Sequence, residues 1–245
     1  MSAKVAIVTG GGRRLGKQIA LALAREGCDL FVTFRASEAG AHATVTEARE
    51  LGRRAHAMRA DLRAARDCRA AAAAALALFG GADILINNAA LFPTESIDEL
   101  SPESWDQVAR LNLLAPILLT RALAPALAAR HGAVVNIGSV GGRIPYRRHI
   151  AYSLSKSALA HATRALARRY APAVRVNSLA PAGIAFADDD PNGPRDEAPL
   201  PPLGRVPLGR HATPEEITSA VVFLATRAPY MTGQTVFVDG GRSIA

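Results

Sequence analysis

The 245-residue chain has few cysteines and aromatic residues, and no apolar run reaches the roughly 18 residues that a membrane span needs. Its two cysteines, Cys28 and Cys68, form neither a disulfide framework nor a metal spacing, and the six histidines show no ligand spacing, so we expect no metal. Residues 1–9 lack the features of a signal peptide. We therefore expect a cytoplasmic protein that does not bind membranes.

The net charge of +8 does not by itself indicate a nucleic-acid-binding protein. The arginines are spread over the whole length, and aromatic residues make up only 5% of the chain. A solvated, arginine-rich surface and a small ligand that bears phosphate account for this charge, so we expect a small-molecule ligand and no nucleic acid.

Lysine is scarce, and one of the three lysines lies four residues after a tyrosine. Of the 29 basic residues only Lys4, Lys17 and Lys156 are lysines, and the others are arginines. Tyr152 precedes Lys156 in the segment AYSLSK. Because positions i and i+4 share one face of a helix, the phenol and the ammonium can point into one cleft. A nearby cation favours the phenolate and lowers the pKa of tyrosine from about 10, which suits proton transfer. The alternative is an ordinary solvated pair.

Short apolar runs alternate with segments of helical periodicity along the whole chain. The predicted strands are 4–9, 29–34, 54–59, 82–87, 132–138, 174–179 and 235–238, and the predicted helices are 15–26, 37–51, 64–79, 101–130, 150–170 and 213–226. Strands separated by helices imply right-handed crossovers and a parallel sheet covered on both faces. We predict an α/β fold, a single-domain, doubly wound, Rossmann-like sheet over residues 1–245, with its ligands beyond the carboxyl ends of the strands.

One long stretch does not follow this alternation. Residues 181–207 are rich in proline and acidic residues and follow a predicted strand at the ligand edge. Loops of this length in compact domains are usually lids or disordered segments. We predict a substrate lid at about 182–210.

A glycine-rich turn, Thr9 to Gly16, follows the first predicted strand and opens the first predicted helix. Glycines let the backbone approach a pyrophosphate, and a helix N-terminus offers unpaired N–H groups and partial positive charge. Taken alone, the same pattern is also compatible with a purely structural turn.

Five motifs in order make the chain similar to the short-chain dehydrogenase/reductase family over nearly its whole length. They are the glycine-rich turn, Asn87-Asn88-Ala89-Ala90, Asn112, Ser139, and Tyr152 with Lys156. The resemblance implies hydride transfer from a nicotinamide cofactor in a homotetramer. It also implies that Ser139 donates a hydrogen bond to the substrate, that Tyr152 supplies the proton, and that Lys156 holds the nicotinamide ribose and assists Tyr152.

The resemblance gives Asn112 a catalytic role through its backbone carbonyl, which binds the water that replaces the proton. The sequence adds a physical reason, because Pro116 lies four residues later and has no N–H to donate. The carbonyl of Asn112 should therefore lose its usual helical partner. A simple kink is the alternative.

Two residues resemble the pteridine reductase branch of the family. Arg14 stands at the middle glycine of the turn, and Phe92, four residues after Asn88, stands where that branch stacks an aromatic ring on the pterin. Ser139 departs from it, since some pteridine reductases carry Asp there. The prediction is a pteridine or dihydrofolate substrate; the alternatives are a carbonyl reductase acting on a ketoacyl or other ketone substrate, and a non-catalytic NADPH sensor. The predicted substrate residues are Arg14, Phe92, Ser139 and Tyr152.

The end of the second predicted strand indicates which cofactor is used. NAD-specific relatives place an acid there, whereas this chain has Arg35. A carboxylate would repel a 2′-phosphate, and an arginine can bind it through paired charge-assisted hydrogen bonds, so we predict NADPH/NADP+. The predicted cofactor-binding residues are Gly10, Arg13, Arg14, Leu15, Gly16, Arg35, Ala36, Ser37, Asp61, Leu62, Asn88, Ala89, Ala90, Tyr152, Lys156, Pro181, Gly183 and Ile184.

Overall fold

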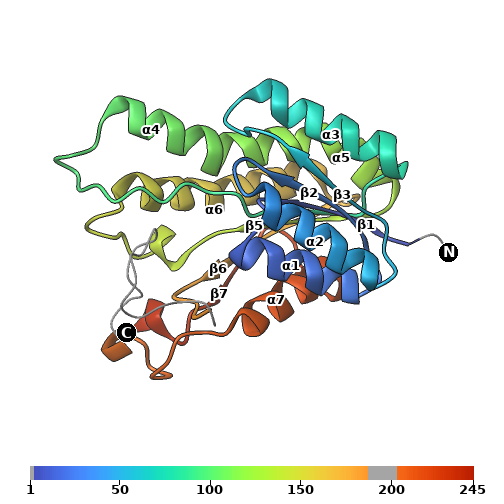
Figure 1. Cartoon of the computed structure of the whole chain (residues 1–245). Coiled ribbons are helices and arrows are strands. Elements are labelled where there is room, and N and C mark those ends of the chain that lie inside the picture. Colours follow the sequence, from blue (N-terminus) through green and yellow to red (C-terminus); the bar gives the residue numbers. More distant parts are fainter. Residues whose placement is uncertain (1–2, 187–202) are drawn as a thin grey trace.

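A computed structural model describes residues 3–186 and 203–245 (Figure 1). Its strands are β1 (Val5–Thr9), β2 (Asp29–Phe34), β3 (Ala55–Arg59), β4 (Ile84–Asn87), β5 (Ala133–Ile137), β6 (Arg175–Pro181) and β7 (Thr235–Val238). They form one parallel sheet in the order β3-β2-β1-β4-β5-β6-β7. The order reverses between β1 and β4, and ligands of such sheets bind in the crevice at that point. The predicted doubly wound fold is confirmed.

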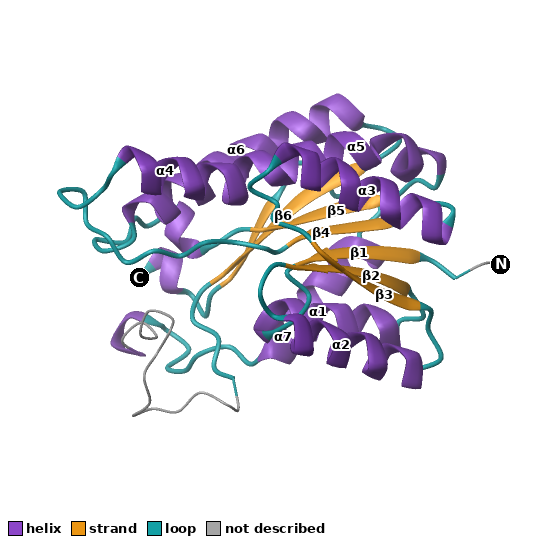
Figure 2. Ribbon diagram, turned by 45° about the horizontal axis from the view of Figure 1, so that its top comes forward, coloured by secondary structure: helices purple, strands orange, loops and turns teal. Residues whose placement is uncertain are grey.

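Helices cover both faces of this sheet. The helices are α1 (Arg14–Arg25), α2 (Glu38–Glu50), α3 (Ala65–Phe79), α4 (Pro102–Ala109), α5 (Ala115–Ala129), α6 (Ile150–Tyr170) and α7 (Pro214–Val222). Helices α1, α2 and α7 pack on one face, and α3, α5 and α6 on the other (Figure 2). The short segments are the π-helices η1 (Arg110–Leu114) and η4 (Phe223–Arg227) and the 3-10 turns η2 (Val140–Gly142), η3 (Leu203–Arg205) and η5 (Arg242–Ile244).

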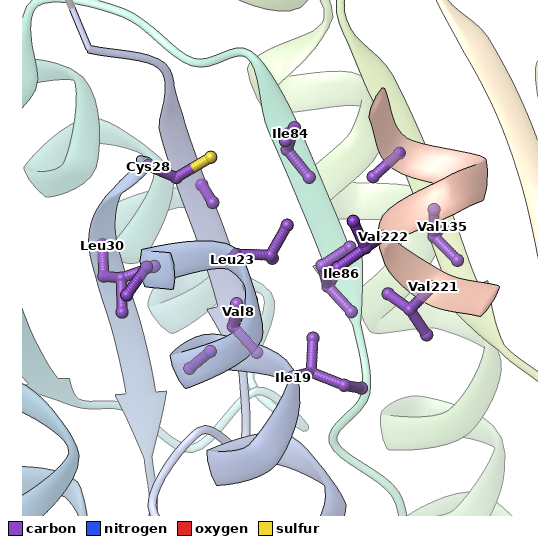
Figure 3. Close-up of a cluster of buried hydrophobic side chains, with 14 of the residues drawn as sticks. Val8, Ile19, Leu23, Cys28, Leu30, Ile84, Ile86, Val135, Val221 and Val222 are labelled. Carbon is purple, nitrogen blue, oxygen red and sulfur yellow. The ribbon is translucent and has the colours of Figure 1, made fainter. Parts of the chain in front are cut away.

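The central strands are buried on both faces, which is why they have continuous apolar sequences. Every residue of β1, β2, β4 and β5 is buried. Neighbouring residues of a strand point to opposite faces, so Val8 packs with Ile19 and Leu23 of α1 (Figure 3), while Ile7 belongs to the cluster on the other face. The sheet therefore holds two cores together, one beneath each helical layer.

The two cysteines are buried free thiols. Cys28 and Cys68 are not joined by a disulfide, and burial raises the pKa of each thiol to about 11. Both side chains serve as small apolar groups in the core.

The predicted helix over residues 101–130 differs from the structure in one respect. Helix α4 ends at Ala109 and is followed by the π-helical segment η1 before α5 begins. Within it the N–H of Ala115 donates to the carbonyl of Arg110, five residues earlier. Because Pro116 supplies no N–H to the carbonyl of Asn112, an α-helical pattern cannot continue unbroken at this position.

This helical stretch is strongly apolar, although Arg121 interrupts its apolar run. As one helical unit, Pro102–Ala129 is long and apolar enough to cross a membrane by length and composition, and 44% of its most apolar window is buried inside the protein. Three of its own leucines, Leu119, Leu123 and Leu127, are almost fully buried in the hydrophobic core between this helix and the sheet. In this structure the stretch packs as a core helix does.

The predicted lid falls largely on residues 187–202, which lie outside the described residues. Its described flanks are tied to the ligand edge, since Ile184 forms an isolated parallel bridge with Ala212 and the N–H of Ala212 donates to the carbonyl of Gly183 at 3.1 Å. The predicted start of the helix after this region is confirmed, because Thr213 and Glu216 form a capping box at α7.

Candidate active site

The glycine-rich turn lies at the switch point between β1 and β4 and is joined to both strands. The hydroxyl of Thr9 accepts the N–H groups of Asn88 and Ala89 at 2.9 and 3.0 Å, and the side-chain amide of Asn88 donates to the carbonyl of Thr9 at 2.9 Å. Ala90, the next predicted residue, is exposed. The glycine-rich turn and the Asn87–Ala90 motif, both predicted to bind the cofactor, are therefore joined by hydrogen bonds at the same edge of the sheet.

Two glycines of this turn are required by its geometry. Gly10 has a φ of +66°, a conformation that suits glycine. A Cβ atom on Gly16 would overlap the carbonyl oxygen of Gly10 and would lie 2.6 Å from the side-chain nitrogen of Asn88. Only glycine lets the start of α1, at Leu15 and Gly16, approach the turn this closely.

Arg14 holds a backbone conformation that is rare for its residue type. Its φ is +47°, and its guanidinium carbon lies 4.2 Å from the centroid of the Phe186 ring, just after β6. Arg13 precedes it as the exposed N-cap residue of α1. Left-handed backbone at a non-glycine residue costs energy and clusters at functional sites, so this residue marks the turn as a candidate ligand site.

The predicted 2′-phosphate residues follow β2 and lie next to the glycine-rich turn. Arg35 and Ala36 are exposed and Ser37 is half-buried, and a Cβ on Gly12 would lie 2.8 Å from the carbonyl oxygen of Ser37. The turn and the end of β2 therefore touch. An exposed guanidinium at this place is accessible to an anion.

Asp61 and Leu62 follow β3 at the same edge. The carboxylate of Asp61 forms an ion pair with Arg63, and the hydrogen bond from that guanidinium lowers the pKa of Asp61. Leu62 is buried. On the other side of the switch point, Pro181 ends β6, and Gly183 and Ile184 follow it, half-buried.

Lys156 lies on α6 beneath the carboxyl end of β5. Its side chain is 3% exposed, and Nζ donates to the carbonyl of Ile137 at 2.6 Å. The same atom lies 5.5 Å from the centroid of the Tyr152 ring. Burial lowers the pKa of this ammonium from 10.5 to about 8. The structure therefore places the cation and the phenol of the i,i+4 pair on one face of α6.

Ser139 leaves β5 two residues after Ile137. Its hydroxyl oxygen accepts the N–H of Gly141 at 3.0 Å, which caps the η2 turn. That turn packs on α6, because a Cβ on Gly142 would lie 2.9 Å from the carbonyl carbon of Lys156. The hydroxyl of Ser139 is thus fixed beside the helix that carries Tyr152.

Asn112 acts as a clamp in this structure. Its Oδ1 accepts the N–H of Leu91 at 2.8 Å, and its Nδ2 donates to the carbonyl of Leu91 at 2.9 Å and to the hydroxyl of Ser155 at 3.1 Å. Ser155 in turn donates to the carbonyl of Tyr152 at 2.7 Å. The side chain therefore joins the segment after β4 to the turn of α6 that bears Tyr152. The sequence did not suggest this contact.

An aromatic cluster surrounds Tyr152, and the sequence indicated only part of it. The Phe92 ring stacks on His149, with centroids 4.1 Å apart and planes at 10°, and meets the Tyr152 ring edge-on at 4.4 Å. Tyr146 completes the cluster at 6.4 Å from Phe92. His149 is 9% exposed, and its Nδ1 lies 2.8 Å from the carbonyl oxygen of Pro93. In the sequence, His149 was marked only by its position at the start of the helix that bears Tyr152.

Comparison with known proteins identifies the family. Residues 11–243 match the family model described as Enoyl-(Acyl carrier protein) reductase. The chain is 37% identical over 241 residues to an uncharacterized oxidoreductase of Mycobacterium tuberculosis, covering 97% of this chain and 91% of that protein. It is 32% identical over 241 residues to the 3-oxoacyl-[acyl-carrier-protein] reductase FabG of Staphylococcus aureus, covering 97% of each.

A solved structure of similar sequence has the same fold. The short chain dehydrogenase of Burkholderia cenocepacia J2315, determined in complex with NADP, superposes with a TM-score of 0.90 at 32% identity and covers 99% of this chain and 98% of that one. With the family model matched over almost the whole length and relatives above 30% identity, the chain belongs to the short-chain dehydrogenase/reductase family of oxidoreductases.

Proposed function

We propose that the protein is an NADPH-dependent carbonyl reductase that transfers hydride to a ketone carbon. The observation that carries the proposal is the arrangement of Lys156, Tyr152 and Ser139 at the carboxyl end of β5. Ser139 follows the strand whose last residue, Ile137, accepts a hydrogen bond from Lys156, and Tyr152 lies one helical turn before Lys156. Such an arrangement would supply a hydrogen-bond donor, a proton donor and a cation to one substrate. A protein that only sensed the cofactor would have no need of that set.

A ketone substrate has more support than the pteridine predicted from the sequence. One face of the Phe92 ring is already covered by His149, and its other close neighbour is Tyr152. A pterin would have to stack in that crowded place. The comparisons give no specific support to the pteridine branch, whereas the relative from Staphylococcus aureus is a 3-oxoacyl reductase. Ketone reduction, the alternative weighed from the sequence, is therefore the function we propose.

In this proposal each of the four predicted catalytic residues has a role that fits its environment. The Ser139 hydroxyl donates to the substrate oxygen, and Tyr152 gives that oxygen a proton as hydride arrives at the carbon. The buried Lys156 ammonium stabilises the negative charge left on the phenol, and low polarity around it strengthens the effect. The backbone carbonyl of Asn112, in the π-helical segment, holds the water that replaces the proton.

The cofactor in this proposal is NADP(H), the nucleotide bound in the structure from Burkholderia cenocepacia. Its pyrophosphate would lie against the Gly10–Gly16 turn at the start of α1, and the exposed Arg35 would take the 2′-phosphate. When bound, NADPH supplies the hydride. The proposal also keeps the cytoplasmic location expected from the sequence and the homotetrameric assembly implied by the family resemblance, which fractionation and sedimentation would test.

The test is an NADPH depletion assay with methyl ketones, acetoacetyl thioesters, dihydropterin and dihydrofolate. We expect oxidation of NADPH with ketones and not with the pterins. Tyr152→Phe should lower kcat by at least a thousandfold and leave the Kd for NADPH within about threefold of the wild type, since only the proton donor is lost. Turnover of dihydropterin alone, or a fully active Y152F variant, would refute the proposal.

A further inference from the structure

Arg242, in the η5 turn after β7, stands out among the arginines of the described residues. It is half-buried, and its guanidinium makes no hydrogen bond to any residue in the ranges 3–186 and 203–245. Four other half-buried arginines donate to carbonyl or carboxylate oxygens; these are Arg53, Arg63, Arg130 and Arg175. A guanidinium has five N–H donors, and partial burial limits how many of them water can satisfy. The guanidinium therefore finds no acceptor among the described residues and is left to water or to a ligand.

The position of Arg242 connects it to the candidate active site. Its guanidinium carbon lies 5.4 Å from the centroid of the Tyr146 ring, and that ring belongs to the cluster around Tyr152. Tyr146 also borders the turn after Ser139, because a Cβ on Gly141 would lie 2.7 Å from its ring. Ring contacts thus lead from Tyr152 through Phe92 and Tyr146 to the guanidinium of Arg242.

The charge of Arg242 is not neutralised by a neighbouring carboxylate in the described chain. Asp239 lies three residues earlier, but its carboxylate accepts the N–H groups of Gly241 and Ser243 at 3.0 and 2.8 Å and makes no ion pair with Arg242. A second cation, the exposed Arg143, follows the η2 turn, and its guanidinium carbon lies 5.3 Å from the Phe237 ring. Aromatic rings therefore adjoin Tyr152, and the guanidinium groups of Arg242 and Arg143 adjoin Tyr146 and Phe237.

We propose that the substrate is a ketone with a carboxylate at the end remote from the carbonyl, and that Arg242 binds this carboxylate. A planar guanidinium matches a carboxylate with two parallel hydrogen bonds, and the Tyr146 ring holds it in place. Two aromatic side chains separate Arg242 from Tyr152, so the anion belongs at the far end of the chain and not beside the ketone. This inference rests on the proposed ketone reduction.

The experiment compares straight-chain methyl-ketone carboxylic acids of increasing length with their methyl esters in the NADPH depletion assay. The esters keep the ketone and the length and remove only the charge. We expect one of the longer acids to exceed its ester at least tenfold in kcat/KM. Arg242→Gln should abolish this difference through KM while turnover of the ester is retained, and Arg242→Lys should restore part of it.

Arg147→Gln is the matched control, because Arg147 is an exposed arginine of the same loop as Tyr146. We expect R147Q to keep the preference for the acid. Equal rates for acids and esters in the wild type, or an equal loss of preference in R147Q, would overturn the assignment of Arg242. If the folded, NADPH-binding protein reduced neither acids nor esters nor other ketones, the proposed function itself would fail, which is a different result. The ester rate and NADPH titration of R242Q show whether that variant is folded.

Discussion

Replacement of Lys156 by methionine should separate the energetics of catalysis from those of folding. Burial lowers the pKa of this lysine from 10.5 to about 8, so the ammonium is less favourable in the folded protein than in the unfolded chain. At about 1.4 kcal/mol for each pKa unit, this corresponds to about 3 kcal/mol of stability lost at neutral pH. Lys156→Met removes that cost. It also removes the hydrogen bond to the carbonyl of Ile137, which costs about 1–3 kcal/mol.

The two effects nearly cancel at about pH 7, so we expect the free energy of unfolding of K156M to equal that of the wild type or to exceed it by up to about 2 kcal/mol. The difference should depend on pH in a defined direction. Between about pH 8 and 10.5 the unfolded wild type binds more protons than the folded form, so wild-type stability rises with pH. The variant lacks this rise. By about pH 10 it should therefore be the less stable of the two, while its turnover is lower by orders of magnitude at every pH.

Urea unfolding of both proteins at several pH values provides the measurement, with NADPH oxidation as the assay of turnover. Lys17→Met is the control, because Lys17 is partly exposed and pairs with Glu47 on the surface. It should change stability by less than about 1 kcal/mol. A loss of more than about 3 kcal/mol in K156M at pH 7, or a difference that is independent of pH, would show that burial of this ammonium does not oppose folding.

Three further predictions concern the cofactor edge and the Asn112 clamp. Arg35→Gln should weaken NADPH binding at least tenfold, which is about 1.4 kcal/mol, and leave NADH binding unaffected. In the same fluorescence titrations the control Arg59→Gln should leave the affinities for both nucleotides unchanged. Equal losses of affinity for the two nucleotides in R35Q would contradict the 2′-phosphate role. Asn112→Ala removes both hydrogen bonds to the backbone of Leu91 and should lower the free energy of unfolding, measured in urea, by about 3 kcal/mol. A loss below about 1 kcal/mol would argue against the clamp. Gly16→Ala should abolish NADPH binding because its methyl group would overlap the turn. The control Gly204→Ala should bind NADPH normally, because a Cβ atom there meets no neighbour. Normal NADPH binding by G16A would show that the turn can move.

Local sequence determined most of the fold, because the signals for its elements lie within each element. The bounds of β2, α6 and β7 match the predicted ones, and the capping box begins α7 where expected. Buried parallel strands are continuous apolar runs, and helices have their own period, so both can be recognised without knowledge of their neighbours. The i,i+4 pair of Tyr152 and Lys156 is likewise a property of one helix.

Contacts between distant segments were decided only by the tertiary structure. The hydrogen bonds from Asn112 to Leu91 and the stacking of Phe92 on His149 join residues that are 21 and 57 positions apart, and no local pattern specifies them. The lowered pKa of Lys156 depends on how completely packing excludes water from its ammonium. Arg242 resembles every other arginine in the sequence, and only the folded chain places it beside Tyr146, with no hydrogen-bond acceptor in the part of the chain that the structure describes. Sequence supplied the chemical groups, and packing set their distances, burial and partners, because those depend on which elements meet in space.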